Sequence, residues 1–295
     1  MTADGDAPLY DEFYFRHGCG LPYERSPHWL AFFGQIAERI TKGIGPRTVL
    51  DAGCAIGLLV EALRERGVDA YGVDIAEYAL AQVPEGLRPF CWQGSVTDPL
   101  PQHYDLIVCI EVLEHLPQGQ AERAVANLCA FTDDVLFSSS PLDYREATHL
   151  TARPPEYWAG LFAEQGFVRD VDFDAGFITA WATRFRRTRE ALPRLIAGYE
   201  RRFWRLWQEN SELRQQALET RRELAGLEQR LADAGTELAA RQARLDQIAA
   251  GPGWQALQAI GPALSWLVPP NSRREQWARW AAGWLSRRAR GGRRA

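Results

Sequence analysis

VLDAGCAIGLLVEAL, at residues 49–63, and YGVDIAEYAL, at residues 71–80, are the stretches that decide the fold of this 295-residue chain. The first is an apolar run that ends in Asp51, breaks into a turn of small residues and continues into a helical pattern. This order is typical of a nucleotide-binding strand, loop and helix, because small residues let the backbone approach a ligand closely. The second run ends in Asp74, where an acid can accept hydrogen bonds from both hydroxyls of a ribose. Together the two runs predict a site for an adenosine-containing cofactor.

The spacing of the small residues narrows the choice of cofactor. Gly53, Ala55 and Gly57 form the pattern G-x-A-x-G. A dinucleotide site needs G-x-G-x-x-G, in which the third glycine stands three places after the second. The sequence therefore disfavours the binding of a pyrophosphate.

A second motif adds a resemblance to a known family. YDLIVCIEVLEHLP, at residues 104–117, is an apolar strand that runs into E-V-L-E-H-L. Together with DAGCAIG at 51–57, it resembles the class I S-adenosylmethionine-dependent methyltransferases, whose first motif reads roughly D/E-x-G-x-G-x-G. Ala55 replaces the middle glycine of that motif. Because alanine adds only one methyl group, we expect the loop to keep its conformation. The resemblance covers about residues 20–185 and implies S-adenosyl-L-methionine as the cofactor.

Strand-like and helical patterns alternate along the first two thirds of the chain. The strand-like runs lie near 47–52, 69–73, 89–93, 104–110, 133–139, 167–173 and 177–183, and the helical ones at 27–42, 56–66, 76–82, 119–130 and 154–165. This alternation predicts an α/β fold with a doubly wound, seven-stranded and mainly parallel sheet, the Rossmann-like methyltransferase fold. Only Ala175 and Gly176 separate the last two runs, so these are expected to pair as an antiparallel hairpin.

The pattern beyond residue 190 is helical throughout. Apolar residues alternate at spacings of three and four, which predicts a coiled coil and a homo-oligomer. The seam is Phe203, Leu206, Asn210, Leu213, Ala217, Thr220, Leu224, Leu227, Leu231, Ala234, Leu238, Arg241, Leu245 and Ile248. The alternative is a single long helix that folds against the catalytic domain. The expected organisation is an N-terminal cap segment and helix (1–46), a methyltransferase domain (47–187), a coiled coil (188–250) and a Trp/Arg-rich helical tail (251–295).

Charge is concentrated at the C-terminal end. Residues 271–295 hold eight Arg and one Glu, a net charge of +7, which leaves −11 for the rest of a chain whose total is −4. An acidic body argues against nucleic acid as a partner. Trp277, Trp280 and Trp284 share a helical face in the basic tail, which suits peripheral membrane contact or, alternatively, packing on another helix or chain. No apolar run of about 18 residues and no signal sequence is found, so we expect a cytoplasmic protein, which membrane contact through the tail would place at the inner face of the membrane.

The resemblance assigns the cofactor residues position by position. Asp51, Gly53, Ala55 and Gly57 would form the loop beside the methionine portion, Asp74 and Ile75 would hold the ribose and the adenine edge, and Ile110 and Glu111 would flank the cofactor. Ser95 and the backbone of Val96 would replace an acid that the family usually has after its third strand. Arg25 matches a basic residue that quinone-pathway relatives use on the cofactor carboxylate, or is an ordinary surface arginine.

Two histidines are candidates for a general base. His115 and His149 follow predicted strands at the edge where open α/β sheets bind ligands, and a neutral imidazole suits the removal of a proton from a hydroxyl. Each could instead only order its own loop. Glu111, Glu114 and His115 resemble a magnesium-binding trio of some quinone methyltransferases, but E-x-x-E-H is common without metal, and no metal is assigned.

The sequence leads to a functional hypothesis with two alternatives. We expect an S-adenosylmethionine-dependent methyltransferase that O- or N-methylates a sugar of a bacterial surface polysaccharide or its precursor, because the coiled coil and P-P-x-S-R-R tail resemble those of enzymes that build such glycans. One alternative is a small-molecule or quinone-type acceptor. The other is a non-catalytic coiled-coil scaffold for glycan-assembly enzymes at the membrane.

Overall fold

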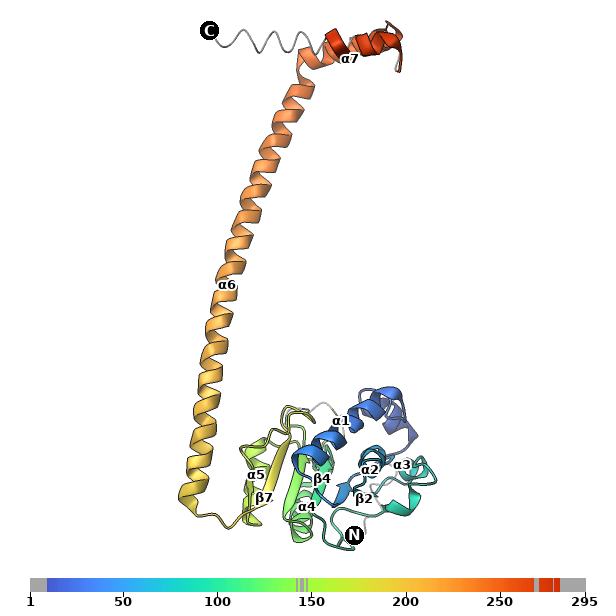
Figure 1. Cartoon of the computed structure of the whole chain (residues 1–295), viewed down its shortest axis with the longest axis vertical. Helices are drawn as coiled ribbons and strands as arrows, with labels where there is room; N and C mark the ends of the chain where they lie inside the picture. Colours follow the sequence, from blue (N-terminus) through green and yellow to red (C-terminus); the bar gives the residue numbers. More distant parts are fainter. Residues whose placement is uncertain are drawn as a thin grey trace. The chain divides into compact units, whose positions relative to one another are not determined.

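The computed structural model describes residues 10–141, 143, 146, 148–267, 271–277 and 279–281. The chain divides into two compact units, one that reaches to Leu206 and one that starts at Trp207. The first unit contains the sheet with its covering helices, as Figure 1 shows. The boundary between the units falls inside a helix, and the four segments expected from the sequence stay predictions.

Seven strands form one sheet in the order β3-β2-β1-β4-β5-β7-β6. Their bounds are β1 Thr48–Ala52, β2 Asp69–Asp74, β3 Cys91–Gln93, β4 Leu106–Ile110, β5 Asp134–Ser138, β6 Phe167–Arg169 and β7 Thr183–Arg187. Strands β1 to β5 are parallel to their neighbours, and β7 is antiparallel to both β5 and β6. The predicted seven-stranded, mainly parallel sheet is confirmed.

Helices cover both faces of this sheet. They are α1 Pro27–Gly43, α2 Leu58–Arg64, α3 Glu77–Ala81, α4 Gln118–Ala130 and α5 Pro155–Glu164. Alternate residues of a strand point to opposite faces. Val49 and Val108 pack with the apolar side chains of α1 to α3, whereas Leu50 and Cys109 pack with those of α4 and α5. The doubly wound, Rossmann-like architecture follows, and it brings the carboxyl ends of β1, β2 and β4 to one edge.

The antiparallel pairing at the end of the sheet is confirmed, but the expected strand at 177–183 is wrong. Strand β6 ends at Arg169, β7 begins only at Thr183, and turns and irregular chain connect them in place of a two-residue link. The apolar residues that suggested a strand are buried in another way. Ile178 and Ala182 pack into the cluster formed by α1 to α3, so their burial needs no pairing in the sheet.

One helix, α6 (Leu192–Ala250), runs for 59 residues without interruption and has no buried residue. The helix predicted for this region is confirmed, while self-association stays a prediction. Gly251 separates α6 from α7 (Pro252–Leu267). The rings of Trp277 and Trp280 lie 5.5 Å apart between their centroids, whereas Trp284 lies outside the described residues. Within the described part of the chain, none of the helices combines the length and apolarity needed to span a bilayer.

Candidate functional site

The loop between β1 and α2 has a backbone that the small residues make possible. Gly53, Ala55 and Gly57 have φ angles of 93°, 45° and 77°, in the left-handed region that glycine adopts most easily. A Cβ atom on Gly53 would lie 2.2 Å from Cγ2 of Val112, which follows β4. Ala55 keeps the left-handed conformation despite its methyl group, as expected. The loop therefore bends sharply at the carboxyl end of β1, packed against the loop after β4.

Asp74, the last residue of β2, holds this loop. Its Oδ2 accepts a hydrogen bond from the backbone N–H of Ala55 at 2.7 Å, and its Oδ1 accepts one from Ala76 at 2.8 Å. The backbone N–H groups of Gly53 and Cys54 donate to the Val73 carbonyl. Burial raises the pKa of Asp74, and the backbone hydrogen bonds oppose that rise. A carboxylate oxygen has two lone pairs, so Asp74 keeps acceptor capacity for a ligand.

Asp51 lies in β1 beside this acid. Its side chain is buried, and desolvation, with the charge of Asp74 as a second cause, raises its pKa to about 8. The same two carboxylates contribute to the raised pKa of Tyr23, after burial as the main cause. The acids predicted at residues 51 and 74 are therefore brought together, close to a tyrosine from the segment before α1.

Glu111, immediately after β4, has a strained backbone that three hydrogen bonds support. Its φ angle is 52°, in the left-handed region that non-glycine residues seldom adopt. Its backbone N–H donates to the Ser138 carbonyl, and its Oε1 accepts from the Ser138 hydroxyl at 2.6 Å and from Trp181 Nε1 at 2.9 Å. The adjacent Ile110 pairs with Ser138 in the sheet. Sequence reasoning missed Trp181, because it lies 70 residues from Glu111 in a region expected to be a strand.

The adenine-side candidates lie at the same sheet edge. Asp74 pairs with Gln93 of β3, whose side-chain amide donates to the Ile75 carbonyl. Ser95 accepts a hydrogen bond from the Thr97 backbone with its hydroxyl. Val96 is buried, and its carbonyl accepts a hydrogen bond from the Asn127 side chain. Their contact with a cofactor stays a prediction.

Arg25 makes a bidentate ion pair with Glu61 of α2. The two Nη atoms lie 2.9 and 2.6 Å from the two carboxylate oxygens of Glu61. The structure shows no contact between Arg25 and the acids at the sheet edge among the described hydrogen bonds and ion pairs. Capture of a cofactor carboxylate by Arg25, which stays a prediction, would have to compete with Glu61.

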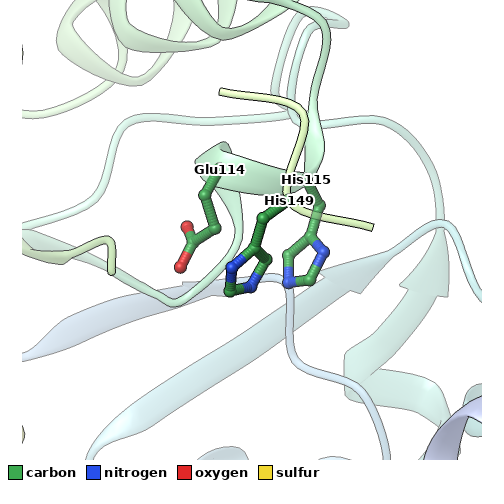
Figure 2. Close-up of side chains that lie close together, drawn as sticks. All are labelled: Glu114, His115 and His149. Carbon is green, nitrogen blue, oxygen red and sulfur yellow. The ribbon is translucent and has the colours of Figure 1, made fainter. Parts of the chain in front are cut away.

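The two candidate histidines lie side by side, from loops far apart in sequence (Figure 2). Their ring centroids are 4.7 Å apart. His115 Nδ1 lies 3.1 Å from the Thr148 hydroxyl, which donates a hydrogen bond to Glu146 at 2.6 Å. Burial, followed by the proximity of His149, lowers the pKa of His115 to about 4, so this imidazole is neutral at physiological pH. Neither Thr148 nor Glu146 was singled out from the sequence, although both belong to the polar stretch before His149.

His149 has an oxygen beside each ring nitrogen. Nδ1 lies 2.8 Å from the Asp143 carbonyl, and Nε2 lies 3.2 Å from Glu146 Oε2. The loop that carries His149 is tied to the loop after β4, because the Thr151 N–H and hydroxyl donate to the carbonyls of Glu114 and Leu116.

Side chains of the types that can bind a metal ion also gather here, although the sequence analysis assigned no metal. Donor atoms of Glu114, His115 and His149, drawn in Figure 2, lie within 4.8 Å of one another. The same holds for donor atoms of Asp143, Glu146 and His149. Glu114 is fully buried; one carboxylate oxygen accepts from the Ser140 N–H, and the other has no hydrogen-bond partner among the described residues. Burial and the nearby charge of Glu111 raise the pKa of Glu114 well above its ordinary value.

The loop and the acids fit S-adenosylmethionine. The left-handed turn leaves no side chain at Gly53 or Gly57, Asp74 offers an acceptor for ribose hydroxyls, and the adjacent carboxylates suit a cation. With the sheet order and its antiparallel last strand, this site defines a class I S-adenosylmethionine-dependent methyltransferase domain.

The chain belongs to a methyltransferase family, since the family model described as a methyltransferase domain matches residues 24–228. Among curated relatives, it is 37% identical over 101 residues to the ubiquinone biosynthesis O-methyltransferase of Idiomarina loihiensis, which spans 32% of this chain and 40% of the relative. It is 34% identical over 113 residues to the enzyme of the same name from Pseudomonas fluorescens, and this match covers 35% of this chain and 48% of the relative. The chain thus spans less than half the length of these relatives.

Solved structures with a similar fold are more distant in sequence. Magnesium protoporphyrin IX methyltransferase from Synechocystis, with bound S-adenosylmethionine, is 19% identical, with a TM-score of 0.47 over 64% of this chain and all of the other. An amino pentose methyltransferase from Micromonospora echinaspora is 18% identical, with a TM-score of 0.45 over 58% of this chain and 94% of the other.

Proposed function

We propose that this protein transfers a methyl group from S-adenosylmethionine to a hydroxyl or amine on a sugar of a bacterial surface polysaccharide or its precursor. The observation that carries the proposal is the polar character of the sheet edge after β4 and β5. The side chains gathered there are Glu111, Glu114, His115, Ser138, Glu146, Thr148 and His149. Hydrogen-bonding groups of this kind suit a hydroxylated acceptor, whereas a prenylated quinone needs an extended apolar groove.

His115 is the base in this proposal. The Thr148 hydroxyl uses its single proton to donate to Glu146, so its oxygen accepts from His115 Nδ1–H. The lone pair of a neutral ring is then on Nε2, which can take a proton from an acceptor hydroxyl. The pKa of about 4 keeps the ring neutral at physiological pH, although it also makes the ring a weak base. A weak base is sufficient here because the sulfonium of S-adenosylmethionine supplies a good leaving group.

His149 is a positioning residue in the same scheme. Each of its ring nitrogens faces an oxygen acceptor, and the nitrogen that carries the hydrogen donates to the Asp143 carbonyl or to Glu146. Either bond ties this loop together. Glu146 in turn holds Thr148, which orients His115. The residues of this relay align the acceptor and hold its proton, which is the main task left to the protein in methyl transfer.

An acceptor panel tests the proposal. Purified full-length protein and methyl-labelled cofactor would be offered nucleotide-activated sugars, surface oligosaccharides, and phenolic quinone precursors. Transfer to a sugar hydroxyl or amine is expected, and label found only on the phenols would overturn the glycan acceptor. Cofactor binding without transfer to any compound would favour the non-catalytic scaffold.

Variants of the relay test the assignment of the base. His115→Gln should lower kcat by about 100-fold, since general-base catalysis contributes on that order, while cofactor affinity stays unchanged. Thr148→Val should give a smaller loss in kcat by removing the group that fixes the tautomer. The control is His103→Gln, because His103 precedes β4 at the other edge of the sheet and packs near Phe131. Equal activity of His115→Gln and the control would remove His115 from the reaction.

The quinone-type acceptor remains the second candidate function. The curated relatives are named ubiquinone biosynthesis O-methyltransferases, and their identity to this chain, 34 to 37%, lies in less than half of their length. The phenolic compounds in the acceptor panel therefore decide between the two candidates directly.

A further inference from the structure

The stretch of α6 from Phe203 to Ile248 exposes an apolar row along its whole length. Leu213, Leu231 and Leu238 are 63, 75 and 69% exposed. A helix whose apolar residues recur at alternating spacings of three and four buries them against another helix. Because α6 is one uninterrupted helix, this row cannot fold back on itself. The chemistry of the row itself shows which partner it fits.

The row reads almost the same from either end. Residues equally distant from the junction of Ala225 and Gly226 have matching character in six of seven pairs. These are Phe203 with Ile248, Leu206 with Leu245, Asn210 with Arg241, Leu213 with Leu238, Ala217 with Ala234, and Leu224 with Leu227; Thr220 with Leu231 is the exception. When two identical helices pack antiparallel about this junction, each residue faces its counterpart. Outside the Thr220–Leu231 pair, large residues then meet large ones, small meet small, and Asn210 meets Arg241.

We propose that two copies of this chain pair through α6 in antiparallel orientation, centred on the junction of Ala225 and Gly226. The proposal goes beyond the methyltransferase activity and does not depend on the identity of the acceptor. It fixes a property that the heptad spacing alone leaves open, namely the direction and the register of the two helices.

The charges that flank the row agree with this register. The seam alternates between two series of positions, one that starts 203, 210, 217 and one that starts 206, 213, 220. In an antiparallel pair, residues that precede a position of the first series contact one another across the two helices. Residues that follow a position of the second series do the same. The resulting charged contacts are Glu209 with Arg244, Glu223 with Arg230, and Arg221 with Glu228, each made twice by symmetry. All three join opposite charges, and all six side chains are exposed in the single chain. No like-charge contact arises at these flanking positions.

A parallel pair in register places every seam residue opposite its own copy, so the sizes also match, but its charges are less favourable. Arg241 would face Arg241 within the seam, where two guanidinium groups repel. Glu223 would face Glu228 across the flank, so Glu209 with Arg214 would be the attractive charged contact that remains. Because these like charges repel only in the parallel pair, they favour the antiparallel orientation.

Antiparallel pairs shifted by one heptad are also disfavoured. A shift in one direction puts Glu223 against Glu223 and Arg221 against Arg221. A shift in the other direction puts Arg230 against Arg230 and Glu228 against Glu228. The charges therefore favour the register centred on residues 225 and 226 over both of its neighbours.

Cross-linking with single cysteines tests the orientation. Full-length Ala217→Cys and Ala234→Cys chains, carrying tags of different mass, would be co-expressed and treated with a short thiol cross-linker. The antiparallel pair predicts a link between the two different chains and none between identical ones, because residues 217 and 234 face each other. Identical positions would lie 17 residues apart along the helix, roughly 25 Å. Links between identical chains alone would show a parallel pair and overturn the proposal.

The unsubstituted chain is the control for this experiment. The first unit contains five cysteines without disulfides, namely Cys19, Cys54, Cys91, Cys109 and Cys129. Any product that the unsubstituted chain also forms arises from these residues and is subtracted. Bands that appear only with the introduced cysteines report on α6.

Charge reversal gives an independent test with opposite outcomes for the two orientations. Glu223→Arg turns two Glu223–Arg230 contacts into repulsive ones, so sedimentation equilibrium should show roughly tenfold weaker dimerisation. Adding Arg230→Glu should restore the wild-type affinity. In a parallel pair Glu223→Arg would instead strengthen association, because it removes the repulsion with Glu228. Glu212→Arg is the matched control, since residue 212 points away from the seam and should leave the affinity unchanged.

The mass of the complex completes the test. The 33.3 kDa chain should sediment as a species of twice that mass. A monomer at all concentrations, a larger oligomer, or a dimer strengthened by Glu223→Arg would each overturn the proposal.

Discussion

Gly53→Ala perturbs the loop that defines the site and tests its architecture. The new side chain would have to adopt φ near 93°, which costs a non-glycine residue about 1–3 kcal/mol. Its Cβ would also lie 2.2 Å from Cγ2 of Val112, far inside the 3.5–4.0 Å of a normal carbon contact, and such overpacking costs about 1–3 kcal/mol. Together the two effects should lower the free energy of unfolding by about 2–6 kcal/mol.

The same substitution should weaken cofactor binding. The clash can be relieved only by moving the loop after β1 or the loop after β4, and both carry predicted cofactor residues. Urea unfolding followed by tryptophan fluorescence measures the stability, and calorimetry measures the affinity for S-adenosylmethionine. We expect at least a tenfold loss of affinity. Stability and affinity equal to those of the wild type would refute the close packing of these two loops.

Three further variants separate the causes. Gly53→Ala with Val112→Ala removes the two Cγ contacts, leaves Cβ of residue 112 at 3.3 Å and keeps the backbone strain, so stability should recover in part relative to the sum of the single changes. Gly119→Ala in α4 is the control for substitution at a glycine with open space around it, and should change stability by no more than about 1 kcal/mol. Ala55→Gly relaxes a left-handed position in the same loop and should keep cofactor affinity.

Four other predictions concern the site and the tail. Asp74→Asn replaces a carboxylate that accepts two backbone hydrogen bonds, and calorimetry should show at least tenfold weaker cofactor binding; unchanged affinity would contradict the role of Asp74. His115 must be neutral to accept a proton, and because its pKa is about 4, kcat should stay level as the pH falls from 7 to 5; a half-maximal rate near pH 6.5 would assign the proton to another group. The histidine relay needs no metal, so dialysis against EDTA should preserve activity, whereas a loss reversed by a divalent cation would assign the Glu114, His115 and His149 cluster to a metal ion. If the basic tail contacts membranes, truncation after residue 250 should abolish sedimentation with anionic liposomes, and equal pelleting of both forms would exclude that contact.

The parts of the fold that the sequence predicts are those with strong local signals. The strand that contains Leu50 and Asp51 is a short apolar run followed by small residues, and both its place and its loop are as expected. The last strand was misplaced because Ile178 is buried by packing against helices that are distant in sequence. A short apolar run shows that residues are buried but does not show which element buries them.

In the candidate site too, the sequence predicts where residues lie along the sheet but not which side chains they contact. Sequence periodicity placed His115 and His149 at one sheet edge, because parallel strands end together there. It could not show that Thr148 and Glu146 orient His115, since hydrogen bonds between loops depend on side-chain geometry. The partner of Arg25 was hidden for the same reason, as Glu61 lies 36 residues away in a helix.

The electrostatics of the site support the choice of cofactor independently of the motif. Desolvation raises the pKa of both Asp51 and Asp74. The charge of Asp74 raises the pKa of Asp51 further, so an added negative charge near Asp51 is unfavourable. A pyrophosphate would bring two more negative charges toward these carboxylates, whereas a sulfonium and an ammonium would stabilise their ionised forms. The binding of such a cation should therefore lower both pKa values and release protons near neutral pH, since the pKa of Asp51 in the free protein is about 8. Asp51 therefore makes this edge costly to a pyrophosphate and favourable to a cation, whereas an acid at residue 74 suits the ribose of either cofactor.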